Sequence, residues 1–289
     1  MPSQVRVVDS IPVDIDHRKV IQSREFRRLK GRETEIELMA EKGRGLIRPR
    51  AVLTFLEVKG IDKDRIRLGS DHVLESLILS DTLEIGQTIA PYVITIGREL
   101  EDEASRMSAR DVFGGWALAR MGDLALGNAS VHVRSLAAQE LGDGLSDFAP
   151  GTGTGKLFGI KQQAVLFDIL NPPGNIGVSL TSSYLMMPIK SISGVFAKVQ
   201  REYVACQYCP KRCESRRKPF AGEYQRIACK LGESGSAVSS HDALTSRLSK
   251  TNSREGPGHR PSPHQLEDQC DDRDYEEPDL EKGHCPLDP

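Results

Sequence analysis

Three cysteines lie close together in the C-terminal half of the chain, at Cys206, Cys209 and Cys213. Thiolates at this spacing can all face one soft ion, either zinc or the iron of an iron–sulfur cluster. A tetrahedral site needs a fourth ligand, for which Cys229 is the best candidate, although a histidine or an exogenous ligand would also serve. Basic residues beside the cluster favour the thiolate form: Lys211, Arg212, Arg216 and Arg217. Unligated thiols and a disulfide stay open as alternatives to a metal site.

A glycine-rich turn, residues 149–155, is a second candidate for ligand binding. It is not a phosphate-binding P-loop, because Pro150 and Leu157 stand where that motif needs a glycine and a hydroxyl residue. Nor does it fit the dinucleotide fingerprint, since its glycines alternate and no convincing strand precedes them. Flexible backbone with free N–H groups can nevertheless approach a ligand closely. The alternative is a plain surface loop.

Residues 180–188 place hydroxyl groups beside bulky apolar side chains. Met186 and Met187 are expected to fill core space rather than to line a cofactor site. The next segment, residues 191–199, alternates as a half-buried strand does. No Ser/His/Asp set and no paired carboxylates stand out for catalysis outside these segments.

The remaining elements predict an α+β fold, a twisted antiparallel sheet flanked by helices. Strands are expected at residues 51–58 and 91–97, and helices from residue 33 and over residues 100–107 and 112–138. We expect a helical turn at residues 83–90 and a polar, turn-rich segment at residues 59–72. Strands and helices do not alternate regularly enough for a doubly wound parallel sheet. The alanine-rich helix 112–138 is expected to pack closely in the core.

Composition limits the domains and the partners. The chain has 289 residues and a net charge of −2, so no global field favours nucleic acid or an anionic membrane. It has no apolar run of roughly 18 residues and no signal-peptide pattern at its start. Clustered thiols predict a reducing, cytoplasmic location. Residues 230–289 lack Ile, Phe and Trp, so we expect a folded region 1–229 and a disordered, acidic, Ser/Pro-rich tail 230–289.

Four blocks resemble the activation domain of vitamin B12-dependent methionine synthase, in its short stand-alone form. The first is the strand-glycine-helix entry at residues 93–101, and the second is Ala-Pro-Gly at residues 149–151. The third block combines Leu-Thr-Ser-Ser, Met-Met-Pro and Ser-Ile-Ser-Gly within residues 180–194 and is the most specific. The fourth is the cysteine cluster, with Arg216 three residues after its last member.

The resemblance implies an α+β fold and an accessory role in corrinoid-dependent methyl transfer, as part of a methyltransferase system. Family members bind S-adenosylmethionine and present its methyl group to inactive cob(II)alamin, while a flavodoxin-like donor supplies an electron. The implied partners are therefore a corrinoid protein, or the methionine synthase cobalamin module, and a reductase. Carried over by position, the implied cofactor-binding residues are Ala149, Pro150, Gly151, Thr152, Ser183 and Tyr203.

Three positions depart from the family pattern. Asp147 and Thr152 stand where the family has an arginine and a tyrosine that engage S-adenosylmethionine, and Ser182 replaces a glutamate. An aspartate repels a carboxylate that an arginine would pair with. The sequence therefore leaves two other hypotheses open: a non-catalytic scaffold that binds a corrinoid protein, and a redox module with a cysteine-ligated metal.

Overall fold

The computed structural model describes residues 4–22, 31–152, 157–209, 211, 216–221 and 227. By its contacts the chain divides into two units, Met1–Ala205 and Cys206–Pro289, and each is described by itself. The predicted boundary at residue 229 stays a prediction. The tail 230–289, Cys213 and Cys229 lie outside the described residues.

The first unit is built on an eight-stranded sheet in which every pairing is antiparallel. Its central strand, β6 (Thr88–Thr95), is buried at every position but the first, which explains the continuous apolar run in the sequence. β2 (Arg50–Leu53) and β10 (Ser191–Lys198) pair with β6 on its two sides. The other strands are β1 (Arg6–Val8), β3 (Leu56–Asp62), β4 (Arg65–Leu68), β5 (Val73–Glu75) and β7 (Leu145–Phe148).

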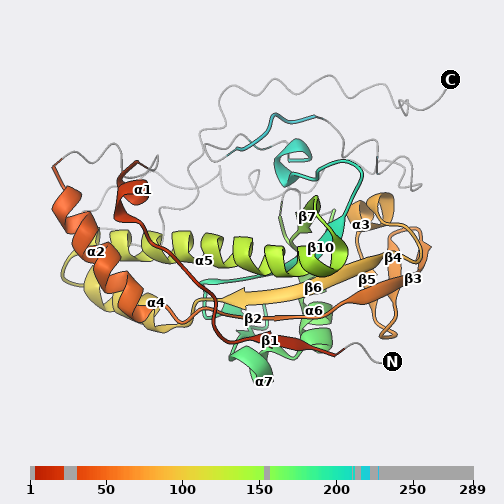
Figure 1. The fold of residues 1–289 in the computed structure, drawn as a ribbon, viewed down its shortest axis with the longest axis horizontal. Coiled ribbons are helices and arrows are strands. Elements are labelled where there is room, and N and C mark those ends of the chain that lie inside the picture. Colours follow the sequence, from red (N-terminus) through yellow and green to blue (C-terminus); the bar gives the residue numbers. More distant parts are fainter. Residues whose placement is uncertain are drawn as a thin grey trace, which may run out of the picture. The chain divides into compact units, whose positions relative to one another are not determined.

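Helices cover both faces of this sheet (Figure 1). Side chains alternate along β6, so Tyr92 and Ile94 pack with α5 (Val112–Leu141), whereas Val93 faces α6 (Gln163–Leu170) and α7 (Pro172–Ile176). The other described helices of the first unit are α1 (His17–Gln22), α2 (Glu33–Leu46), α3 (Leu77–Thr82), α4 (Glu99–Ser108) and η1 (Ile160–Gln162). The short helix η2 (Ala205–Gln207) spans the boundary between the two units. The predicted α+β class is confirmed.

The long helix α5 lies against the sheet through small side chains. Ala125, Ala129 and Ala137 are fully buried, and their size lets the helix axis approach the strands closely. Asp111 caps its start by accepting a hydrogen bond from the Gly114 N–H (2.9 Å). Gly142, at φ +83°, ends it in a conformation that favours glycine.

Several local predictions were wrong. The polar segment 59–72 forms the end of β3 and all of β4, because its apolar residues alternate with charged ones. The expected strand 51–58 is interrupted after Leu53 and becomes β2 and β3. The helical turn expected at residues 83–90 lies earlier, as α3, and β6 begins within that range.

Two further expectations concern burial. β10 is central rather than half-buried, since it lies between β6 and β7 and six of its eight residues are buried. Met186 packs beside the buried Val93 cluster, as a core filler does, but Met187 is 37% exposed. Both methionines form β9 (Met186–Met187), which pairs with β8 (Ser179–Leu180) in a separate hairpin.

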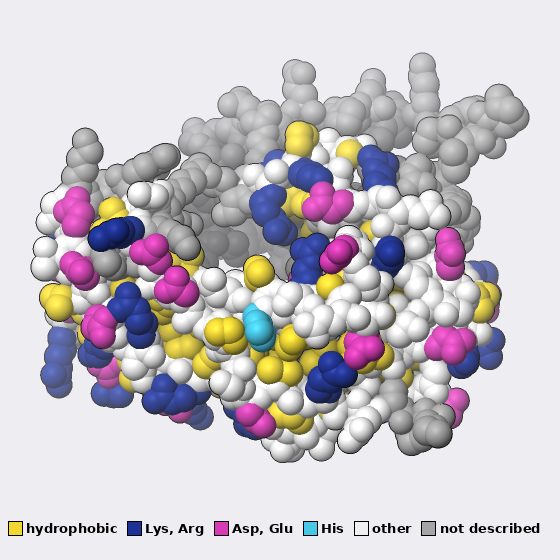
Figure 2. Space-filling model, in the orientation of Figure 1, with side chains coloured by type: hydrophobic (Ala, Val, Ile, Leu, Met, Phe, Trp, Pro, Cys, Tyr) yellow, Lys and Arg dark blue, Asp and Glu magenta, His cyan; other side chains and the backbone are white. Residues whose placement is uncertain are grey.

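No helix in the described part of the chain is long and apolar enough to span a bilayer. On the face shown in Figure 2, hydrophobic side chains gather in the middle and charged side chains of both signs surround them. This mixture fits the near-zero net charge and gives that face no field of a single sign.

Candidate functional site

The candidate site lies along β7, a short strand that the sequence did not reveal. Contrary to the expectation that no strand precedes the glycine turn, β7 runs directly into it. Within the described residues β7 pairs as a strand only with β10. Leu145, Ser146 and Phe148 are nevertheless buried, so the strand is covered by other parts of the fold.

A buried polar contact fixes β7 to the centre of the sheet. The Tyr92 hydroxyl donates a hydrogen bond to Asp147 Oδ1 (2.7 Å), and the Tyr92 ring stacks on Phe196 with centroids 4.1 Å apart. Burial raises the pKa of Tyr92 well above its usual value, and the Asp147 carboxylate raises it further. Asp147 thus belongs to the packing of the sheet, in addition to the role its charge would have toward a ligand.

Gly194 makes this contact possible. A Cβ added to Gly194 would lie 2.8 Å from the Tyr92 hydroxyl, 2.8 Å from the Phe148 carbonyl oxygen and 3.0 Å from Asp147 Oδ1. The glycine of the Ser-Ile-Ser-Gly block is therefore required by the space that the Tyr92–Asp147 pair and the Phe148 carbonyl occupy.

The glycine turn begins directly after β7, and residues 153–156 of it lie outside the described residues. Gly151 adopts φ +80°, and its N–H donates to the Phe158 carbonyl (2.8 Å). A Cβ at Gly151 would lie 2.7 Å from Ile160 Cδ1, so the turn packs closely on η1. Pro150 is buried, whereas Gly151 and Thr152 are exposed. The Thr152 hydroxyl donates to the Ala149 carbonyl (2.8 Å), which closes the turn.

The two other predicted binding residues lie in different surroundings. Tyr203 is buried, stacks on Phe148 with centroids 4.5 Å apart, and its N–H donates to Ser146 Oγ (2.9 Å). It therefore lies beside β7, as do Ala149–Thr152. Ser183 is an exposed residue of the turn that joins β8 to β9.

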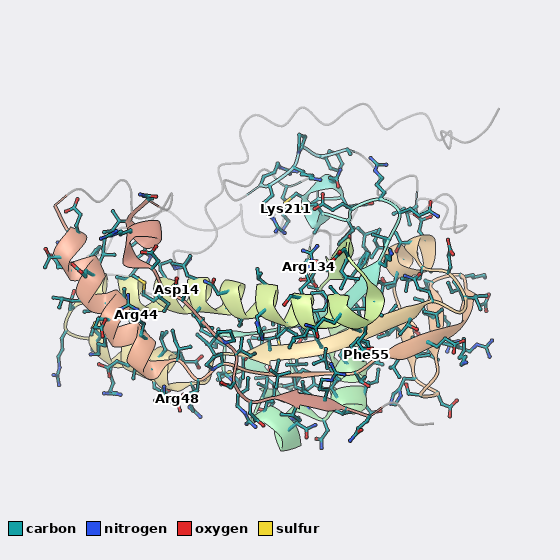
Figure 3. All side chains as sticks on the ribbon, in the orientation of Figure 1. Asp14, Arg44, Arg48, Phe55, Arg134 and Lys211 are labelled. Carbon is teal, nitrogen blue, oxygen red and sulfur yellow. The ribbon has the colours of Figure 1, made fainter. Side chains whose placement is uncertain are left out.

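An open cavity of about 460 Å³ lies against the start of β7. Its apolar wall includes Val131, Ala138 and Leu145, and its charged groups include Arg134 and Asp143. Arg134 projects from α5 toward β7 and donates a hydrogen bond to the Leu145 carbonyl (Figure 3). No local pattern in the sequence predicts this cavity, because Arg134 and Leu145 come from different elements that only folding brings together.

A Ser/His/Asp contact also appears on the surface. The His72 ring bonds to Ser70 Oγ through Nδ1 (3.0 Å) and to Asp168 through Nε2 (2.9 Å). The Asp168 side chain is 77% exposed, whereas a carboxylate that orients a catalytic histidine is buried. The neighbouring N–H groups of Gly69 and Asp71 already donate to carbonyls, so they are not available to a developing oxyanion. We interpret the contact as a surface tie between the β4–β5 turn and α6.

In the second unit, Arg216 holds the cysteine segment in a compact turn. Its guanidinium donates to the carbonyls of Cys206 (2.7 Å), Cys209 (2.9 Å) and Lys211. The Arg217 N–H donates to Cys206 Sγ (3.5 Å). That N–H is the main cause that lowers the pKa of the Cys206 thiol. The Lys218 N–H and the charges of Arg217 and Arg216 add to it, and burial opposes it.

The metal prediction is not tested by this geometry. Among the described residues, no three His, Cys, Asp or Glu side chains come together in a way that could hold an ion. Two of the four predicted ligands, Cys213 and Cys229, lie outside those residues. Cys206 and Cys209 are present as free, partly exposed thiols.

Comparisons with known proteins agree with the resemblance seen in the residues. Residues 149–212 match the family model described as "Vitamin B12 dependent methionine synthase, activation domain". The matched segment holds the glycine turn, β10, Cys206 and Cys209, and the predicted family resemblance is confirmed there.

Among solved structures, the fold is similar to the crystal structure of the MetH reactivation domain bound to AdoHcy. The TM-score is 0.53 at 13% sequence identity, over 70% of this chain and 80% of that chain. At this identity the likeness is one of fold. No curated protein matches the chain.

Proposed function

Since residues 149–212 match the activation-domain family and the first unit has that domain's fold, we propose an accessory, reactivation-type role in cobalamin-dependent methyl transfer. The family match over the segment that follows β7 carries this proposal. The partner is a corrinoid protein or a methionine synthase cobalamin module, and a reductase supplies the electron. We propose no nucleic-acid or membrane partner.

The ligand of the site in this proposal is S-adenosylmethionine, as the AdoHcy-bound structure of similar fold suggests. The S-adenosyl compound and the partner's corrinoid supply the methyl-transfer chemistry, and this chain supplies binding and orientation. Gly151 and Thr152 are exposed and follow β7 directly, and this proposal places the ligand beside them. Their N–H groups donate to the Phe158 and Ala149 carbonyls, so they hold the turn in shape rather than binding the ligand. Phe148 and Tyr203, whose rings stack, hold the strand before the turn in place.

Calorimetric titration of the full-length, anaerobically purified chain with S-adenosylmethionine and S-adenosylhomocysteine tests this proposal. We expect micromolar binding, weakened about tenfold or more by Gly151→Ala, because the new Cβ would displace Ile160 and the turn. Gly177→Ala is the matched control. Gly177 has a similar φ of +72° but open space around it, so the backbone strain is alike and the turn is not touched.

Absence of binding at millimolar ligand would exclude the S-adenosylmethionine part of the proposal. Equal losses in the two glycine variants would exclude the turn as its site.

A second candidate function is a scaffold that binds a corrinoid protein without S-adenosylmethionine. The observation that favours it is Asp147, whose carboxylate accepts a hydrogen bond from buried Tyr92 at the position where the resemblance leads one to expect an arginine. Sedimentation of the chain with a corrinoid protein, with and without S-adenosylmethionine, separates the two functions. Association that does not depend on the ligand supports the scaffold.

We also propose that Cys206, Cys209, Cys213 and Cys229 bind zinc or an iron–sulfur cluster, in a reducing compartment such as the cytoplasm. What supports this is the contact at Cys206, where the Arg217 N–H donates to Sγ (3.5 Å), because N–H donation to a thiolate sulfur is a contact that tunes thiolate ligands. Metal analysis of the anaerobic protein and of Cys206→Ser and Cys209→Ser checks it. Cys285→Ser, outside the predicted ligand set, is the control. A metal-free wild type that takes up no added zinc or iron would contradict the proposal.

A further inference from the structure

The cavity between α5 and β7 carries charges of both signs on an apolar wall. Arg134 and Asp143 both line it. Within the described part of the chain neither takes part in an ion pair, although several other charged residues of this unit do, such as Arg6 with Glu140. The hollow is open to solvent, and its polar side chains, Arg134, Ser135, Gln139 and Asp143, are all exposed.

The Arg134 guanidinium is held in one orientation, but most of its N–H donors remain available to a ligand. The guanidinium has five N–H donors, and one donates to the Leu145 carbonyl. That bond fixes the side chain at the rim of the cavity and leaves the planar group able to pair with a carboxylate through two parallel hydrogen bonds.

The other polar groups suit a cation. Asp143, in the glycine-flanked connection before β7, offers a carboxylate. Ser135 Oγ donates its proton to the His132 carbonyl (2.7 Å), so its lone pairs remain as acceptors. Gln139 adds an amide on the same helix face, one turn further along α5.

We propose that this cavity binds the head group of an α-amino acid, with Arg134 on the carboxylate and Asp143 on the ammonium. The apolar wall of Val131, Ala138 and Leu145 receives the first part of the ligand's side chain. The ligand class is a zwitterionic amino acid with an apolar or thioether side chain, and S-adenosylmethionine has such a head group. This identification of the ligand rests on the proposed function, whereas the charge pairing does not.

The test is an NMR titration of the full-length chain with L-methionine and two analogues. Methionine methyl ester lacks the carboxylate, and N-acetylmethionine lacks the ammonium. We expect L-methionine to bind about tenfold or more tightly than either analogue. In Arg134→Gln, methionine and its ester should bind equally. In Asp143→Asn, methionine and N-acetylmethionine should bind equally.

Two further variants separate binding from folding. Arg98→Gln removes an exposed arginine that pairs only within α4 and its start, and it should change none of these affinities. Arg134→Lys keeps a donor for the Leu145 carbonyl and should retain part of the preference for the carboxylate. A wild type that does not bind methionine, or binds all three compounds alike, overturns the proposal, as do variants that leave the preferences unchanged.

The same variants distinguish this proposal from the function on which its ligand rests. Methionine binding that depends on Arg134, with no binding of S-adenosylmethionine, keeps the head-group site and removes the proposed ligand. Binding of S-adenosylmethionine that Arg134→Gln leaves unchanged keeps the proposed function and removes the head-group site.

Discussion

At the scale of single residues, the hydrogen bond from Tyr92 to Asp147 is the contact that most clearly joins fold and site. Tyr92 is fully buried, and its hydroxyl bonds to the strand that leads into the glycine turn. Tyr92→Phe removes one donor to a carboxylate and keeps the ring that stacks on Phe196. We expect it to lower the free energy of unfolding by about 1.5–3 kcal/mol, as denaturant titration at neutral pH would measure.

The loss of unfolding free energy caused by Tyr92→Phe should become smaller as the pH rises above ~10. The folded-state pKa of Tyr92 is raised, so above pH ~10 the unfolded chain releases a proton that the folded chain keeps. The stabilisation from Tyr92 is therefore complete below pH ~10 and is lost as the pH rises toward the folded-state pKa. The stability difference between wild type and variant should narrow by up to about 1.4 kcal/mol for each pH unit above 10. A constant difference from pH 8 to 11 would contradict this assignment.

Gly194 gives a second prediction at this scale. In Gly194→Ala the methyl group would meet the Tyr92 hydroxyl and the Phe148 carbonyl, so we expect a loss of about 1–3 kcal/mol in unfolding free energy. Gly127 is the matched control, because it lies inside α5 with no atom within 4 Å of an added Cβ. Gly127→Ala should raise stability by roughly 0.5–1 kcal/mol. Thermal melts should show a lower midpoint for Gly194→Ala and a higher midpoint for Gly127→Ala than for the wild type.

At the scale of elements, the turn that Arg216 holds shows how a backbone N–H group sets the pKa of a side chain, the Cys206 thiol. The Arg217 N–H is the main cause of the lowered pKa of Cys206, and neighbouring charges add less. In the metal-free, reduced chain we expect iodoacetamide to alkylate Cys206 with a half-maximal rate below pH ~8.5, the usual midpoint for a thiol. Peptide mass spectrometry across a pH series measures this rate for Cys206 separately.

Two substitutions of Arg217 distinguish the two causes of the lowered Cys206 pKa, the backbone N–H donor and the side-chain charge. Arg217→Pro removes the N–H donor and should raise the midpoint of Cys206 alkylation. Arg217→Gln keeps the N–H, removes only the charge and should raise the midpoint less. A larger effect of Arg217→Gln would show that charge, rather than the backbone donor, sets the pKa of this thiol.

At the scale of the whole molecule, the balance of charge limits the partners. The net charge of −2 gives no global field of one sign, so docking to the partner of the proposed function would depend on shape and local contacts. We therefore expect the affinity of that association to change little between low and physiological salt. A steep salt dependence in sedimentation experiments would point to a charged interface instead.

The family resemblance and the fold class could be predicted from the sequence, because they depend on local patterns. The buried run of β6, the spacing of small residues in α5 and the Ser-Ile-Ser-Gly block are each read within one segment. The same holds for the cysteine cluster, although its predicted metal stays a prediction. Short strands in which charged and apolar residues alternate, such as β4, were predicted as polar turns. In a strand of four residues the exposed charged side chains outweigh the two buried apolar ones that indicate a strand.

Tertiary structure alone decided what lies beside β7. The Tyr92–Asp147 bond joins residues 55 positions apart, and Gly194 is required because that pair and the Phe148 carbonyl fill the space beside it. The cavity with Arg134 and Asp143 likewise exists only where α5 passes the start of an edge strand. Such contacts depend on strand pairing and helix packing between distant segments, and no local spacing in a single sequence encodes them.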